Sequence, residues 1–511
     1  MHPLSPGETP DATFSLCEDD EVNPMHHTLR KPVDSPLSVF TKILICLTTV
    51  FALSRITPAI AQQPRQFRAG AATSNITPWL GISSNGGMQD RAPQHVHDEL
   101  HARALVLDDD QRRLALVTVD SCMVPRQILD EAKKLVHQHS GLPIENMLMS
   151  ATHTHTAGTA TPVFQSEADA EYQLFLTRKI ADSVRIALGN LEPARIGWSV
   201  GSVPQHVFNR RWKMKSGTIS PNPFGGIDQV KMNPAAGSLD LLEPAGPTDP
   251  DLSVISVRAL DGRPIALLAN YSLHYVGAGH FSADYFGVFA DRIQQLLGAD
   301  RQDPPFVGML SNGTSGNINN IDFRQQRPAD APFARMKAVA NDVAAEALRV
   351  ANNTRYHDWV PLAVRQAEIE LGVRRPTAEE LDRARQIMAQ AQGPGMRTPE
   401  EIYARETVLI SKYPPKVPLI LQALKIGDLG IAAIPCEVFV EIGLEIKKQS
   451  PFATTFTTSL ANGYNGYLPT PEHHRLGGYE TWRARSSYLE TDASVRIVER
   501  VLELLQQLRK D

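Results

Sequence analysis

The stretch that decides the fold is residues 146–156, which read NMLMSATHTHT. Its apolar part, residues 147–151, has the length and composition of a buried β-strand. His153 and His155 follow at spacing i, i+2, and in an extended chain such side chains point the same way. Two imidazoles are therefore expected side by side where a buried strand ends. Sites are often built there, and imidazole is a common zinc ligand. Two surface histidines in a threonine-rich loop are the alternative.

Apolar runs of strand length alternate with helix-like spacing along the rest of the chain, without a repeat. The runs predict strands at 67–76, 102–107, 114–119, 147–151, 196–200, 252–260, 264–271, 306–310, 363–371, 419–426, 429–434 and 454–460. The helical spacing predicts helices at 128–139, 166–191 (Ser166 as N-cap), 286–297, 331–349, 377–392, 437–448 and 491–508. This order predicts an α/β fold, with a mixed β-sheet core flanked by helices in one large domain, 62–511.

Residues 213–250 are rich in Gly, Pro and Asn and show little periodicity. We expect a long ordered loop or lid there, because such loops inside a globular chain are usually functional.

The composition is that of an ordinary globular protein. The 511 residues are 42% hydrophobic and 21% charged, with a formal net charge of −5. There is ample apolar surface for a large core. No basic excess points to nucleic acid as a partner.

Residues 1–61 are expected to lie outside the domain, as an N-terminal extension and signal peptide. Lys42 precedes an apolar run, 43–53, which is too short to span a bilayer core of about 30 Å as a helix. Ala59-Ile60-Ala61 then fits a signal-peptidase site. The sequence thus predicts an exported (periplasmic or secreted) protein, with Met25 as a possible true start. An uncleaved membrane anchor is the alternative.

Only Cys122 and Cys436 follow the predicted cleavage point. Both lie in apolar, strand-like contexts, so we expect two buried free thiols, although export would permit a disulfide. Because there is no Cys-x-x-Cys pair, a zinc site would have to use histidine, carboxylate or other oxygen ligands.

Polar side chains follow several other predicted strands. His274 comes after the strand at 264–271, and Glu437 is expected in the first turn of the helix at 437–448. The loop at 311–317 and the loop at 461–467 follow two more strands. Together these strand ends predict one composite site.

These pieces, in this order, resemble the neutral/alkaline ceramidase family. The matching segments are 75–78 (NITP), 101–106 (HARALV), 151–156 (ATHTHT), Asn209-Arg210, 271–274 (YSLH), 312–320, 434–437 (IPCE), 461–467 (ANGYNGY) and 478–480 (GYE). The resemblance spans roughly residues 66–490 and makes 62–511 a ceramidase-like catalytic domain.

The resemblance implies one Zn²⁺ and its ligands. Carried over residue by residue, these are His153, His274, Glu437 and Tyr467. Two imidazoles, a carboxylate and a phenol oxygen are all acceptable to zinc. The phenol is an unusual ligand, which would favour one weak or exchangeable position.

The resemblance also implies the catalytic roles. His155 acts as acid/base or orienting partner, Arg210 holds the carbonyl oxygen or a polar substrate group, and Tyr479 donates to the developing oxyanion. A surface arginine is the alternative for Arg210.

The sequence departs from the family in two ways. The family's nucleophile loop reads Gly-Asp-Val-Ser-Pro-Asn, but here Asn319 falls at the serine position and only a gapped register brings Ser315 near. Zinc-activated water is therefore the expected nucleophile, with Asn317 or Asn319 orienting substrate and Ser315 as the covalent alternative. Second, only one helix is expected after residue 490, where the family usually has a C-terminal β-sandwich domain.

The sequence thus predicts an exported zinc-dependent hydrolase of amide bonds. Its substrate would be ceramide, another N-acyl lipid or a small amide, with possible peripheral membrane contact. A zinc esterase, a non-catalytic exported binding protein that retains the zinc pocket, and a structural envelope protein with incidental histidines are the alternatives.

Overall fold

The computed structural model describes residues 65–277, 279–393 and 395–511. The predicted signal peptide and the Met25 start lie outside these residues. None of the helices in the described ranges combines the length and hydropathy that a membrane crossing requires.

An eight-stranded mixed sheet, in the order β12-β11-β10-β5-β1-β2-β3-β4, forms the first half of the fold. Its strands are β1 (Arg68–Asn75), β2 (His101–Asp108), β3 (Arg113–Val119), β4 (Met147–Ala151), β5 (Glu192–Ser202), β10 (Asp251–Ala259), β11 (Pro264–Tyr271) and β12 (Val307–Asn312). Helices α1 (Arg126–Ser140) and α2 (Ala170–Gly189) cover the β1–β4 part. Helices α3 (Asp284–Leu296) and α4 (Ala334–Asn352) cover the β10–β12 part.

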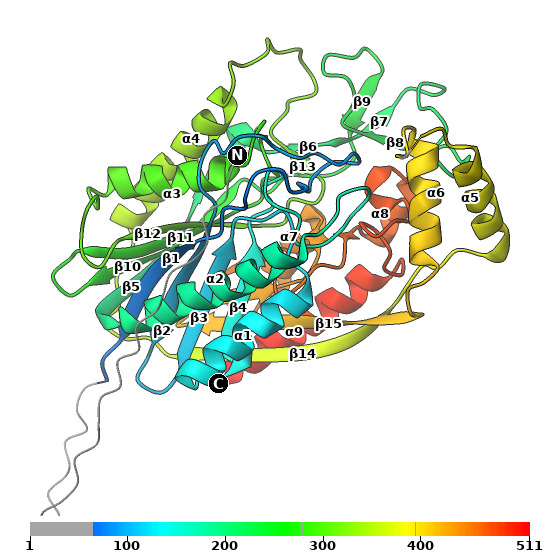
Figure 1. Ribbon diagram of the computed structural model, residues 1–511. Coiled ribbons are helices and arrows are strands. Elements are labelled where there is room, and N and C mark those ends of the chain that lie inside the picture. The colour runs from blue at the N-terminus through cyan, green and yellow to red at the C-terminus, as the bar shows by residue number, and fades with distance from the viewer. Residues whose placement is uncertain (1–64, 278, 394) are drawn as a thin grey trace, which may run out of the picture. The chain divides into compact units, whose positions relative to one another are not determined.

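A second sheet of four strands packs on the other face of the first (Figure 1). Its order is β14 (Leu362–Gly372), β15 (Lys416–Ile426), β16 (Leu429–Ala433) and β18 (Thr454–Thr458). Helices α7 (Val440–Gln449) and α9 (Ala493–Lys510) cover its outer face. The layers therefore run helix, sheet, sheet, helix. The apolar side chains between the two sheets form a core shared by both halves of the chain, as expected for strands buried on both faces.

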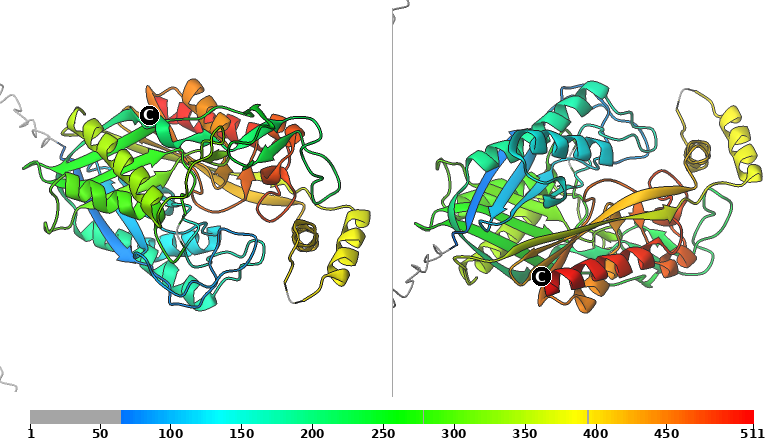
Figure 2. Two further views of the ribbon diagram at one scale, coloured as in Figure 1. Left: turned by 90° about the horizontal axis from the view of Figure 1, so that it is seen from above. Right: turned by 90° about the horizontal axis from the view of Figure 1, so that it is seen from below.

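Short elements surround one end of this sandwich. The two-residue strands are β6 (Phe208–Asn209) with β13 (Ile318–Asn319), and β17 (Glu437–Val438) with β19 (Tyr467–Leu468). Strands β7 (Arg211–Met214), β8 (Val230–Met232) and β9 (Leu241–Pro244) form a separate small sheet. Figure 2 shows the hairpin of α5 (Ala378–Gln390) and α6 (Pro399–Ile410), in yellow, projecting from the sheets. A short helix near the C-terminus, α8, spans Pro471–Leu476.

The α/β prediction is confirmed, and each predicted strand is present within a few residues. Three helix starts were wrong, and one of them is that of α4, which begins at Ala334 rather than at residue 331. Asp169, not Ser166, caps α2 by accepting from the Tyr172 N–H, because the Ser166 hydroxyl is already bonded to Asn85 and Val163. Glu437 precedes α7 and lies on β17.

Two other sequence predictions need correction. Residues 213–250 contain strands β8 and β9 and the end of β7, which pair with one another, so this segment is not simply a loop. Helix α6 was not predicted at all, although it carries a capping box at Thr398 and Glu401 with Pro399 in its first turn, which is a readable start signal.

The shared core yields a stability prediction. Leu424→Ala, on the fully buried β15 face between the sheets, should lower the free energy of unfolding by about 2–5 kcal/mol, because it leaves a cavity that neighbours fill only partly. The same change at Leu242, which is 59% exposed on β9, should cost well under about 1 kcal/mol. Equal losses at both positions in urea unfolding would contradict this packing.

Candidate metal centre

The candidate centre lies where strands of both sheets end. His153 is the second residue after β4, and His274 is the third residue after β11. Glu437 and Tyr467 come from β17 and β19, where they are register partners in the parallel pair. The backbone bridge between Ser150 and Ala461 joins the β4 end to the loop after β18. Pairing between segments far apart in sequence thus brings the four predicted ligands to one place.

His153 does not continue the strand. Its φ is +76°, in the left-handed region, which a residue with a side chain rarely adopts and which costs of order 1–3 kcal/mol. The argument from an extended i, i+2 pair was therefore wrong in its geometry. The two imidazoles nevertheless meet, with His153 Nε2 and His155 Nε2 3.2 Å apart. The backbone turn at His153, rather than strand alternation, aims them at each other.

Backbone carbonyls fix the orientation of all three imidazoles. In His153, His155 and His274 the Nδ1 atom lies within hydrogen-bond distance of a carbonyl oxygen; these belong to Cys122 (2.7 Å), Gly86 (2.8 Å) and Ser315 (3.1 Å). A carbonyl only accepts, so each Nδ1 carries a proton and each Nε2 is the nitrogen left to bind a proton or a metal ion. The three Nε2 atoms converge, since His153 Nε2 is also 3.1 Å from His274 Nε2.

The loop after His274 is held by Asp284, the first residue of α3. Its Oδ2 accepts the backbone N–H groups of Val276 and Gly277 at 3.0 and 2.9 Å. Burial raises the pKa of this carboxyl to about 6. Asp284 is therefore an anchor for the segment that carries His274.

Glu437 completes the cluster with an oxygen that has no donor. Its Oε2 lies 3.1 Å from His153 Nε2 and has no hydrogen-bond partner among the described residues, although it is buried. Its Oε1 accepts the hydroxyl of Tyr464 at 3.0 Å. A buried carboxylate oxygen aimed at bare imidazole nitrogens requires a positive charge between them, because an uncompensated buried charge is costly.

A proton or a metal ion can supply that charge. Burial lowers the pKa of His153, but the Glu437 carboxylate outweighs this and raises it to about 10. The pKa values of His155 and His274 are lowered by burial, with the neighbouring charge of His153 or Arg210 adding to it. Two imidazole nitrogens and a carboxylate oxygen that face one another are a known donor set for zinc. The group of His153, His274 and Glu437 therefore fits a zinc-type ion.

Cys122 offers a second grouping, with His153 and His155. Its sulfur is near Nδ1 of His153, at 3.7 Å, but that nitrogen is directed at the Cys122 carbonyl. Burial also raises the pKa of the thiol, which disfavours the thiolate that a metal needs. The His–His–Glu group is the better metal site. Cys122 and Cys436 are both buried and free, as predicted.

Tyr467 and Arg210 lie together beside the cluster. Arg210 Nη2 donates to the Tyr467 hydroxyl at 3.2 Å and to the Gly316 carbonyl at 2.6 Å, and its Nη1 is 3.5 Å from His274 Nε2. Burial raises the pKa of Tyr467, with the Glu437 charge adding to it. The Tyr467 hydroxyl thus lies beside the Glu437 strand and accepts a hydrogen bond from the Arg210 guanidinium.

Glu480 holds Arg210 in place. Its two oxygens accept Arg210 Nε at 3.1 Å and Arg211 Nη1 at 2.6 Å, and Arg211 and Glu480 are fully buried. Burial alone would raise the pKa of Glu480, but the two guanidinium groups, Arg211 first, hold it below its usual value. Arg210 is therefore a rigid buried cation, not a surface arginine.

A cavity with roughly 350 Å³ of empty space opens onto the cluster. Tyr479 lines it together with His155 and Tyr467, and the Phe164 ring stacks on Tyr479 at 6.3 Å. His155 is less buried than His153 and His274, and its ring stacks on Tyr275 at 3.6 Å. The cavity thus leads to the metal centre along the His155 imidazole and the Tyr479 phenol.

The remaining predicted residues lie away from the cavity wall. Ser315 donates its hydroxyl to Asn312 Oδ1 at 2.8 Å, while its carbonyl accepts from His274. Asn319 is half-exposed and bonds to Asn233 at 3.1 Å. Asn317 accepts the Val440 N–H and donates to Glu441, at the start of α7. The structure does not bring Ser315 or Asn319 into the His–Glu cluster.

Sequence reasoning missed two side chains and two backbone carbonyls that shape the centre. Tyr464 was quoted within a matching segment, but its bond to Glu437 was not foreseen. Glu480 follows Tyr479 directly, and the paired arginines 210–211 were a signal that a buried carboxylate would be needed. The Cys122 and Gly86 carbonyls left no trace in the side-chain pattern.

Comparison with known proteins places this fold. Neutral ceramidase from Pseudomonas aeruginosa shares it with a TM-score of 0.66 at 18% identity, over 88% of this chain and 75% of that one. A ceramidase complexed with C2 shares it with a TM-score of 0.66 at 17% identity, over 88% of this chain and 76% of its own. No family model matches the chain. The chain is thus an α/β protein with a candidate His–Glu metal centre. Its fold is the one seen in neutral ceramidase.

Metal content tests the centre directly. After exchange into a zinc-containing buffer and dialysis, the protein should retain about one zinc per chain, and His274→Ala should lose it because one of two imidazole ligands is gone. His139→Ala, on the exposed face of α1, should retain the metal. Retention of full zinc by His274→Ala in elemental analysis would rule out this ligand set.

Glu480 predicts a pH-dependent stability difference. Glu480→Gln should lower the free energy of unfolding by about 3–5 kcal/mol at pH 7, because Arg210 and Arg211 stay buried without their partner. The folded pKa lies below the ordinary 4.5. The contribution is thus complete above that value and is lost as pH falls through the folded pKa. Urea unfolding between pH 7 and pH 3 should show the gap closing, while Glu472→Gln, an exposed partner of Arg475, should show little gap throughout.

Proposed function

We propose that this protein is an exported, zinc-dependent hydrolase of amide bonds that acts on ceramide or other N-acyl substrates. The observation that carries the proposal is the buried cluster of bare imidazole nitrogens and an unpartnered Glu437 oxygen at the mouth of a cavity. The fold shared with neutral ceramidase supports amide hydrolysis as the reaction class.

His153, His274 and Glu437 would hold the ion, with Tyr467 as the fourth, weaker ligand. When bound, zinc supplies Lewis acidity toward a carbonyl oxygen and lowers the pKa of water toward about 7. The remaining steps fall to side chains of the protein. They bind the substrate amide, hold its oxygen and move protons at the edge of the cavity.

His155 is the proposed acid/base. Its Nδ1 is committed to the Gly86 carbonyl, so only Nε2 can accept a proton. Burial lowers the pKa of this imidazole, so it is neutral before the reaction and releases an accepted proton readily. It lines the cavity. Nε2 of His155 would take a proton from the attacking water. It would then give this proton to the leaving amine nitrogen when the C–N bond breaks.

Arg210 and Tyr479 would stabilise the negative charge that develops on the carbonyl oxygen. Arg210 is pre-positioned by Glu480 and Gly316, so little reorganisation is needed. Burial raises the pKa of Tyr479 strongly, so its hydroxyl stays protonated and remains a donor. The same two groups would serve an ester carbonyl, which makes a zinc esterase the near alternative.

Water is the proposed nucleophile because the Ser315 hydroxyl is engaged with Asn312 and outside the cavity lining. The cavity is small and opens beside the metal centre. The scissile amide and a short stretch on either side would fit, and the remainder of a long acyl chain would extend outside. Peripheral contact with a membrane surface and export remain part of the proposal.

Turnover of N-acyl substrates tests the proposal. Zinc-loaded protein should release the free acid from N-acyl sphingosines or simpler N-acyl amines faster than from matched esters, and a chelator should abolish this. His155→Gln should keep its zinc but lose about 100-fold or more in kcat, with His139→Ala as the unaffected control. Bound zinc with no hydrolysis of any amide or ester would identify a non-catalytic binding protein. Loss of zinc in His155→Gln would make His155 a ligand instead.

A further inference from the structure

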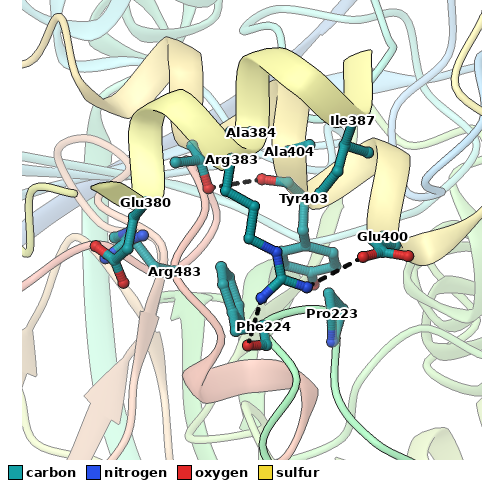
Figure 3. A pocket seen from close by; sticks show the side chains of 11 residues that line it. Pro223, Phe224, Glu380, Arg383, Ala384, Ile387, Glu400, Tyr403, Ala404 and Arg483 are labelled. Carbon is teal, nitrogen blue, oxygen red and sulfur yellow. Dashed lines mark hydrogen bonds and ion pairs between the residues drawn. The ribbon is translucent and has the colours of Figure 1, made fainter. Parts of the chain in front are cut away.

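A second cavity lies beneath the α5–α6 hairpin, with about 380 Å³ of empty space. Figure 3 shows α5 and α6 above it, with Pro223, Phe224 and Arg483 approaching from other parts of the chain. None of its lining residues lines the cavity at the metal centre. Its wall combines apolar groups, including Phe224, Ile387 and the Tyr403 ring, with two glutamate–arginine pairs.

Arg483 brings unused hydrogen-bond donors to this cavity. Its Nη1 pairs with Glu380 at 2.9 Å, and its side chain is 13% exposed. Its Nε and Nη2 atoms are buried and have no partner within the described ranges of the chain. These two atoms form one planar edge of the guanidinium, which matches the two oxygens of a carboxylate. Leaving such donors unpaired is costly, so the edge is built to meet an acceptor.

Tyr403 adds a second unpaired polar group. It is 1% exposed, and its hydroxyl has no hydrogen-bond partner among the residues the structure describes. Phe224 contacts both groups, because its ring packs against the Tyr403 ring at 5.9 Å and lies 5.6 Å from the Arg483 guanidinium. The unpaired Tyr403 hydroxyl and the unpaired Arg483 edge therefore belong to two side chains that line the same cavity and share Phe224 as a neighbour.

The four charged side chains that line the cavity are paired with one another. Arg483 pairs with Glu380, and Arg383 pairs with Glu400 at 3.2 Å. The neighbouring Arg374 donates only to carbonyls and to the Ser487 hydroxyl. Burial, with the Arg483 charge adding to it, lowers the pKa of Arg374 to about 10, so it is still a cation at neutral pH.

We propose that this cavity binds a monocarboxylate with a short hydrocarbon body. The carboxylate would lie on the Nε–Nη2 edge of Arg483 and accept the Tyr403 hydroxyl, and the hydrocarbon would lie against Phe224 and Ile387. The guanidinium edge fits a phosphate as well, but the apolar walls favour a carboxylate with a hydrocarbon body.

An aromatic wall separates this cavity from the metal centre. Tyr403 packs on Trp482 at 5.3 Å and on Phe164 at 5.9 Å, and Phe164 lines the other cavity. The site is therefore distinct from the centre and does not depend on the proposed hydrolase activity. Binding at the two places can be told apart by variants.

Isothermal titration with sodium octanoate at constant ionic strength tests the site. The full protein and His274→Ala should both show saturable binding to this one site. Arg483→Lys keeps the charge but loses the planar edge and should weaken binding at least tenfold. Ile387→Trp should do the same by filling the space. Arg509→Lys, on the exposed face of α9, is the matched control and should bind like the unaltered protein.

Ligand controls define the chemistry, with 1-octanol and inorganic phosphate each expected to bind at least tenfold more weakly than octanoate. Unchanged octanoate affinity in Ile387→Trp and in any folded Arg483→Lys, with folding verified by circular dichroism, would overturn the proposal. So would loss of binding in His274→Ala alone, which would place octanoate at the metal centre. Phosphate binding tighter than octanoate would overturn the carboxylate assignment. Absence of amide hydrolysis would defeat only the proposed function.

Discussion

Three backbone carbonyl oxygens determine what the centre can do. By accepting the Nδ1 protons of His153, His155 and His274, they leave three lone pairs facing one another beside the Glu437 carboxylate. This arrangement is unfavourable without a cation between the groups, whether a proton or a metal. The chemistry of the site therefore follows from hydrogen bonds made on the far side of each ring, which is how outer contacts tune metal ligands.

The two packed sheets make this convergence possible. Strands β4 and β11 belong to the large sheet and β16 and β18 to the small one, and the segments that follow them meet at one end of the sandwich. The meeting requires an unusual backbone at His153, at φ +76°, and this strain is tolerated because the surrounding core is rigid. Buried ion pairs then complete the wall, with Glu480 between two arginines. Positions are thus fixed before any ligand arrives, as electrostatic preorganisation requires.

Local pattern in the sequence was sufficient for much of the fold. Apolar runs such as 114–119 and 147–151 became strands because burial on both faces demands continuous hydrophobicity. The α/β class followed from their alternation with helices. The residues His153, His274 and Glu437 were found from their place after strands and from the family resemblance, and the structure places them within reach of one ion. The sequence did not reveal the backbone geometry at His153, which turns the imidazoles toward one another.

The sequence by itself determined which segments are buried and which side chains capable of chemistry follow them, because hydrophobic periodicity is a local property. Only the tertiary structure decided how those side chains are used. Glu437 was expected in a helix, but pairing with Tyr467 across β17 and β19 drew it into a strand. The roles of Tyr464 and Glu480, and the unpaired edge of Arg483, likewise depend on partners distant in the chain. Such contacts arise from long-range packing, which no short window of sequence encodes.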